Sequence, residues 1–192
     1  EDAKVEAVGP ACETGGSSAC SVLTDGEFFG GTLEDLNQAR RLVRLPLLRK
    51  DFVVDEYQLY QARAAGAAAV LLIAAVLSPD ECRRFARTAH ELELEVLLEV
   101  HTPSELSRLN DLGTFHTDVE NSFRMAALLP REVGGGSGPL PFPASGISDP
   151  ETVVRLREAG FRGFLMGEAF MKSGDPGRAL AEFIARLKEA RP

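Results

Sequence analysis

The chain has 192 residues, enough for one domain with a sizeable core, and its 44% hydrophobic and 26% charged residues are typical of a folded globular protein. Its net charge of −8 argues against broad binding to nucleic acid or to a membrane surface, and no apolar run approaches the roughly 20 residues that span a bilayer. Its three cysteines lack metal-ligand spacing and indicate reduced thiols, so we expect a cytoplasmic protein.

Helix and strand signals alternate along the chain. Apolar segments predict buried strands near residues 19–24, 45–50, 69–74, 94–100 and 161–166. Residues suited to cap a helix precede the segments between them, and these are Thr32, Asp55, Ser78, Thr102, Asp149 and Asp175. Gly66 follows one predicted helix, where a glycine ends a helix at little cost. Repeated units of this kind predict a parallel sheet with right-handed crossovers.

An open, doubly wound sheet and a closed eight-stranded barrel both fit this alternation. No Gly-x-Gly-x-x-Gly follows a strand, so the usual dinucleotide-binding fingerprint is absent. Residues 106–117 show no strand signal, and the glycines and prolines of residues 134–143 have the composition of a linker. We predict a single domain over residues 1–192, with an atypical N-terminal segment 1–18 and the linker-like segment 134–143.

Two predicted strands end abruptly in ionisable residues, Lys50 and Glu99. Because side chains alternate along a strand, Lys50 shares a face with Leu48 while Arg49 points the other way. The carboxyl ends of barrel strands open onto one face, so the two groups are candidates for an acid/base pair. A solvated lysine and a salt bridge between Lys50 and Glu99 are alternatives with the same sequence pattern.

Several segments together carry a family resemblance. They are residues 21–25, 28–31, 47–52, 64–73, 98–101, 145–147 and 165–171. The most specific signal is Arg49-Lys50-Asp51-Phe52 with Glu99-Val100-His101 downstream. With these residues the chain resembles the indole-3-glycerol phosphate synthases, which are (β/α)8 TIM-barrel lyases of tryptophan biosynthesis. The resemblance covers roughly residues 17 to 192.

The resemblance implies a decarboxylating, dehydrating ring closure that converts 1-(2-carboxyphenylamino)-1-deoxyribulose 5-phosphate to indole-3-glycerol phosphate. It implies Lys50 as general acid and Glu99 as its acid/base partner, without metal or organic cofactor. The expected partner is therefore a phosphorylated anilino-sugar, not nucleic acid or membrane, and we expect a monomer or weak homodimer.

The resemblance also suggests how the substrate is held. Apolar walls for the rings are expected from Phe29, Phe52, Leu71 and Leu112. A phosphate cradle is expected from Ser145, Gly146, Gly167 and the backbone beside Glu168. The carboxylate of Glu168 must then point away from the phosphate. Leu71 serves equally well as core packing, and His101 either orients Glu99 or caps a loop.

The chain also departs from the family pattern. Nothing in residues 1–18 matches the Glu-x-Lys pair of the family's first strand, only Asn110 remains of the Asn-rich sixth-strand segment, and Ala144 stands where the seventh strand has Glu. We therefore predict a TIM-type barrel that is poorly matched at strands 1, 6 and 7. A catalytically impaired barrel that only binds a phosphorylated or aromatic anion is the alternative. A neighbouring isomerase of the pathway would need a strand-end Cys/Asp pair, which is not evident.

Overall fold

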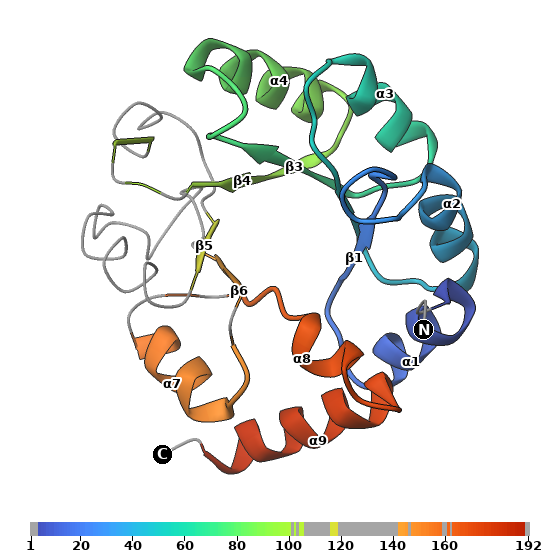
Figure 1. Cartoon of the computed structure of the whole chain (residues 1–192), viewed down its shortest axis with the longest axis vertical. Coiled ribbons are helices and arrows are strands. Elements are labelled where there is room, and N and C mark those ends of the chain that lie inside the picture. The colour runs from blue at the N-terminus through green and yellow to red at the C-terminus, as the bar shows by residue number, and fades with distance from the viewer. Residues whose placement is uncertain are drawn as a thin grey trace.

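The computed structural model describes residues 4–100, 102, 104–105, 116–118, 142–145, 147–158, 161 and 163–190. In this part of the chain, six strands form one parallel sheet in the order β1 to β6 (Figure 1). The strands are β1 Cys20–Leu23, β2 Leu47–Lys50, β3 Ala69–Ile73, β4 Glu95–Glu99, β5 His116–Asp118 and β6 Phe142–Ser145. The first four lie within predicted strand segments, so those predictions are confirmed.

Helices surround the sheet. Their bounds are α1 Val5–Thr14, α2 Leu33–Leu42, α3 Tyr57–Ala64, α4 Pro79–Glu91, α7 Pro150–Glu158, α8 Glu168–Met171 and α9 Pro176–Glu189. Figure 1 shows α2, α3 and α4 outside the first four strands and α7 and α9 on the opposite side, so the strands lie within a ring of helices, as in a barrel. None of the helices described combines the length and apolar character needed to cross a membrane.

The two faces of the sheet have different surroundings. One face of the sheet packs against the helices, and we call its side chains the helix-facing layer. In this layer, four strand residues share one buried cluster with residues of α2, α3 and α4: Leu47, Val70, Leu72 and Leu98. The alternate residues Leu48, Leu71 and Ile73 are also buried but lie outside that cluster. Because successive side chains point to opposite faces, Lys50 and Glu99 belong to this second, inner face.

Hydrogen bonds at the helix starts confirm the predicted caps at Thr32, Ser78 and Asp175, whereas the predicted cap Asp55 is wrong, because the N-cap of α3 is Glu56 and makes no side-chain capping bond. The hydroxyl of Thr32 accepts from the backbone N–H of Asp35, whose carboxylate accepts in return from the N–H of Thr32. Ser78 and Glu81 form the same capping box at the start of α4. Each box satisfies backbone donors that the helix leaves unpaired. Helices α2 and α4 therefore begin where the capping residues predict.

The first and last helices meet where α1 packs against α9. A Cβ built at Gly177 would lie 2.8 Å from the Cβ of Ala11, and one built at Gly15 would lie 2.7 Å from the carbonyl oxygen of Gly177. The two backbones come this close because both positions lack a side chain. The contact joins the two ends of the helix ring in Figure 1.

Two short strands correct the sequence predictions. No strand was expected within residues 106–117, yet His116 and Thr117 belong to β5, which pairs with β4 and β6. The three-residue strand carries no apolar run, so periodicity gives no signal for it. Likewise, Phe142 and Pro143 of the linker-like segment belong to β6. In the described sheet β6 pairs only with β5, an edge position where proline is tolerated.

The predicted strand at residues 161–166 is also wrong. Phe161 and residues 163–166 have no strand assignment. Phe161 is instead buried with Leu156, Phe170 and Phe183 in a second core, and Phe164 packs against it. The apolar character of this segment therefore reflects packing against helices α7, α8 and α9 rather than strand pairing.

Candidate active site

Lys50 is the last residue of β2 and is half-buried on the inner face. Its carbonyl accepts a hydrogen bond of 3.2 Å from the backbone N–H of Thr24, at the end of β1. Its ammonium lies over the ring of Phe29, with Nζ 4.5 Å from the ring centroid. Lys50 forms no ion pair with any residue in the described ranges. The N–H groups of this ammonium are therefore not directed at a carboxylate in the described part of the chain.

Three phenylalanines gather beside this ammonium. The rings of Phe29 and Phe52 stack with centroids 5.6 Å apart and an interplanar angle of 8°. Phe28 meets Phe52 edge to face, with centroids 5.3 Å apart. Phe28 is 69% and Phe29 42% exposed, an unusual exposure for such large apolar side chains. The structure thus brings Phe29 and Phe52, two predicted ring walls, next to Lys50, and it adds Phe28.

Glu99 ends β4, two strands away from Lys50 in the sheet order. It is half-buried and lies opposite Ile73 on one side and His116 on the other. Arg49 pairs with Val70, so the continued register puts Lys50 opposite Leu71, which pairs with Leu97. Glu99 is therefore displaced from Lys50 by two spacings of ~4.8 Å across the sheet and two residues of ~3.3 Å along it.

Leu71 occupies the inner face between these two groups. Only 2% of its surface is exposed, and it is not part of the helix-facing cluster. This position is consistent with both roles considered for it, inner packing and the floor of a ligand site. An ammonium and a carboxylate above an apolar floor, with aromatic rings alongside, suit acid/base chemistry on an aromatic substrate.

The remaining predicted site residues lie elsewhere or outside the described residues. Leu112, Gly146 and His101 are not among the described residues. Ser145 ends β6, and Gly167 immediately precedes α8, where a Cβ would meet no atom within 4 Å. The phosphate cradle around Ser145, Gly146 and Gly167 therefore stays a prediction.

The carboxylate of Glu168 is exposed and forms an ion pair with the residue that caps the end of its helix. Its Oε1 accepts from Nζ of Lys172 over 2.6 Å, and this hydrogen bond lowers the pKa of Glu168. The carboxylate is therefore paired with the cation of Lys172, the C-cap of α8. That it points away from a bound phosphate stays a prediction.

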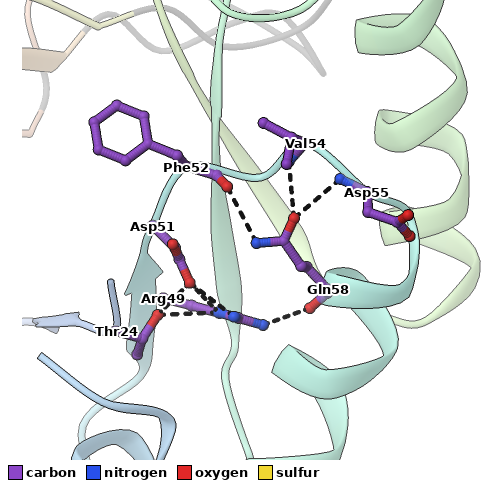
Figure 2. A network of polar contacts seen from close by, with 7 residues as sticks. All are labelled: Thr24, Arg49, Asp51, Phe52, Val54, Asp55 and Gln58. Carbon is purple, nitrogen blue, oxygen red and sulfur yellow. Dashed lines mark hydrogen bonds and ion pairs between the residues drawn. The ribbon is translucent and has the colours of Figure 1, made fainter. Parts of the chain in front are cut away.

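A buried polar network behind Lys50 was not found from the sequence (Figure 2). Nη2 of Arg49 donates to Oδ2 of Asp51 over 2.7 Å, and the two side chains are 5% and 7% exposed. The hydroxyl of Thr24 donates to the same oxygen over 2.7 Å and accepts from Nε of Arg49 over 3.0 Å. Arg49 points to the helix side, as strand alternation predicted, but its link to Thr24 depends on the pairing of β1 with β2.

Among the described residues, no group of three His, Cys, Asp or Glu side chains is arranged to hold a metal ion.

Comparison with known proteins identifies the family. The family model described as indole-3-glycerol phosphate synthase matches residues 1–183. The chain belongs to the indole-3-glycerol phosphate synthase family. It is 51% identical over 199 aligned residues to the indole-3-glycerol phosphate synthase of Bacteroides thetaiotaomicron, covering 98% of this chain and 74% of that protein. The Verminephrobacter eiseniae synthase is 44% identical over 187 residues, covering 90% of this chain and 68% of that protein.

Solved structures agree with the synthase family on the fold, a TIM-type (β/α)8 barrel. N-(5′-phosphoribosyl)anthranilate isomerase from Pyrococcus furiosus aligns with a TM-score of 0.68 at 17% identity, over 97% of this chain and 96% of that one. 3-Hexulose-6-phosphate synthase from Salmonella typhimurium aligns with a TM-score of 0.69 at 14% identity, over 87% of each chain. At such identities the likeness concerns the fold alone, and the predicted fold class is confirmed.

Proposed function

We propose that the inner face of this sheet closes the indole ring of indole-3-glycerol phosphate, with Lys50 and Glu99 as the acid/base pair. As a member of its family, the chain is a carboxy-lyase of tryptophan biosynthesis. The substrate is the phosphorylated anilino-sugar 1-(2-carboxyphenylamino)-1-deoxyribulose 5-phosphate. One observation supports the residue assignment above all: the register places Lys50 and Glu99 on the same face, away from the helix-facing core.

Lys50 activates the ketose carbonyl in this proposal. Attack by the aromatic carbon needs a proton on the carbonyl oxygen, and an ammonium supplies it at the strand end. The unpaired state of Lys50 among the described residues and its seat over Phe29 support this role. Once the carbon–carbon bond has formed, loss of carbon dioxide from the ring carbon restores electrons to the ring.

Glu99 assists the second stage. Dehydration requires a proton for the departing hydroxyl and removal of a proton elsewhere, and a carboxyl group performs both in turn. The displacement of Glu99 across and along the sheet leaves room for the ribulose part of a substrate between it and Lys50. Stacked Phe29 and Phe52 offer a flat apolar surface for the anilino ring.

The phosphate end of the substrate is assigned to the segment around Ser145 and Gly167. Supporting this assignment are the open space at Gly167 and the engagement of Glu168 by Lys172. The monomeric or weakly dimeric state and the cytoplasmic location expected from the sequence stay predictions.

The direct test supplies the purified chain with the anilino-sugar phosphate. Formation of the indole product is followed by its fluorescence, and released carbon dioxide is quantified in the same reaction. We expect one carbon dioxide for each indole product. Binding of a product analogue without any turnover would contradict the proposal and would favour a barrel that only binds anions.

A further inference from the structure

Gln58, the second residue of α3, extends the buried network from Arg49 to the loop that follows Lys50 (Figure 2). Its main-chain carbonyl accepts from Nη1 of Arg49 over 2.7 Å. Its side-chain Oε1 accepts from the N–H groups of Val54 and Asp55, at 2.8 and 3.0 Å. Its Nε2 donates to the carbonyl of Phe52 over 3.1 Å. Through Gln58, Arg49 thus links strand β2 to the loop that carries Phe52.

The network also fixes the carboxylate of Asp51 on the side of the strand opposite to the side chain of Lys50. Asp51 directly follows Lys50, and its side chain lies on the same side as that of Arg49. Its Oδ2 accepts from Nη2 and Nε of Arg49 and from the hydroxyl of Thr24. Three donors on one oxygen hold the carboxylate on the helix side of the strand. Lys50 itself forms no ion pair among the described residues.

A purely stabilising role explains this pair poorly. Removing two charges from water is costly, and replacing a buried ion pair by apolar residues of similar volume is often neutral or stabilising. Arg49 sits in the same layer as Leu47, where apolar side chains pack against the helices. An apolar residue would fit that layer, so the presence of the pair calls for a role at the adjacent site.

We propose that Arg49 and Asp51 are positioning residues, which fix the backbone on both sides of Lys50 and hold the Phe52 loop for ring closure. This inference rests on the proposed function. Neither side chain touches the substrate. Their effect reaches the chemistry through Lys50, whose carbonyl is tied to Thr24, and through Phe52, whose carbonyl is tied to Gln58.

The test removes both charges while keeping the volume, in the double variant Arg49→Met/Asp51→Leu. We expect it to fold with a melting temperature near or above that of the wild type. We expect kcat to fall at least tenfold while KM changes less than threefold, because binding surfaces persist but the proton donor is no longer held. The control Arg63→Met/Glu93→Gln removes an exposed ion pair beyond the amino end of β4 and should leave both constants unchanged.

A kcat of the double variant within threefold of the wild type would overturn the inference. If the double variant does not fold, Thr24→Val decides, because it removes only the hydroxyl that joins β1 to the pair. A kcat reduced at least threefold at unchanged KM then supports positioning, and an unchanged kcat overturns it. Wild-type protein that releases no product refutes the proposed function itself, whereas wild-type turnover with an unaffected variant refutes this inference alone.

Discussion

The ammonium of Lys50 rests over the face of Phe29, with Nζ 4.5 Å from the ring centroid. A cation at this distance is attracted by the ring, by about 0.5–2 kcal/mol depending on how far it is desolvated. Unlike a carboxylate, the ring accepts no conventional hydrogen bond from the ammonium, so its N–H groups can point to a ligand. The contact therefore restrains the position of Lys50 while leaving it able to act as an acid.

Replacement of this ring tests its double role. Phe29→Leu removes the stacking surface and the seat of the ammonium, so we expect KM to rise by about 2- to 12-fold, from about 0.5–1.5 kcal/mol for an aromatic pair. We expect kcat to fall as well, because Lys50 loses its restraint. Steady-state kinetics measures both. Tyr60→Leu, at an exposed aromatic residue of α3, is the matched control, and an equal effect there would argue against a specific role.

The carboxylate of Glu99 is tested by its amide. Glu99→Gln keeps the size of the side chain but removes its proton exchange, so kcat should fall by about 10²–10⁴-fold, the usual contribution of a general acid or base. KM should change little. Glu95→Gln, at the exposed start of the same strand, is the control and should behave as wild type. Equal kcat values for the two variants would exclude Glu99 as the acid/base group.

The helix-facing layer should dominate stability. Leu72 is 1% exposed within the main cluster, so Leu72→Ala should lower the free energy of unfolding by about 2–5 kcal/mol. Val54→Ala, at a side chain that is 61% exposed, should change it by less than about 0.5 kcal/mol. Urea unfolding followed by circular dichroism compares the two. Similar losses for both variants would contradict the assignment of the core.

The thiols of Cys12 and Cys20 give a prediction that depends on pH. A hydrogen bond from the Cys20 thiol lowers the pKa of Cys12 to about 7, and the same contact raises the pKa of Cys20. The thiolate is the reactive form, so alkylation of Cys12 by iodoacetamide should speed up through pH 7. In Cys20→Ala the donor is lost, and the midpoint should move up toward that of an ordinary thiol. A midpoint that does not move would show that the hydrogen bond is unimportant.

The sequence predicted those parts of the fold that depend on local patterns. Strand β3 is apolar throughout and β4 has three consecutive apolar residues, and the caps at Thr32 and Ser78 need only residues three positions apart. The position of Lys50 on the inner face of the sheet follows from the strict alternation of side chains along β2. Strand β5 escaped prediction because its three residues, His116 to Asp118, are all polar and give no periodic signal, and β6 because a proline such as Pro143 normally opposes strand pairing.

Only the site residues that stand at the ends of strands, such as Lys50 and Glu99, could be predicted from the sequence. Phe28 and the pair of Arg49 with Asp51 escaped because their roles depend on neighbours brought together by folding. Thr24 lies 25 residues before Arg49 in the chain, and no spacing rule links them. The strand predicted at residues 161–166 failed for a related reason, since an apolar run does not reveal whether it pairs with a strand or packs against helices.

The most direct measurement is the turnover number of Lys50→Met for indole-3-glycerol phosphate formation, beside wild type and Lys188→Met, a change at an exposed lysine of α9. The methionine has nearly the length of lysine but no proton to give. We predict that kcat falls by about 10²–10⁴-fold in Lys50→Met and stays at the wild-type value in Lys188→Met. A Lys50→Met protein that still closes the ring at the wild-type rate would contradict the account.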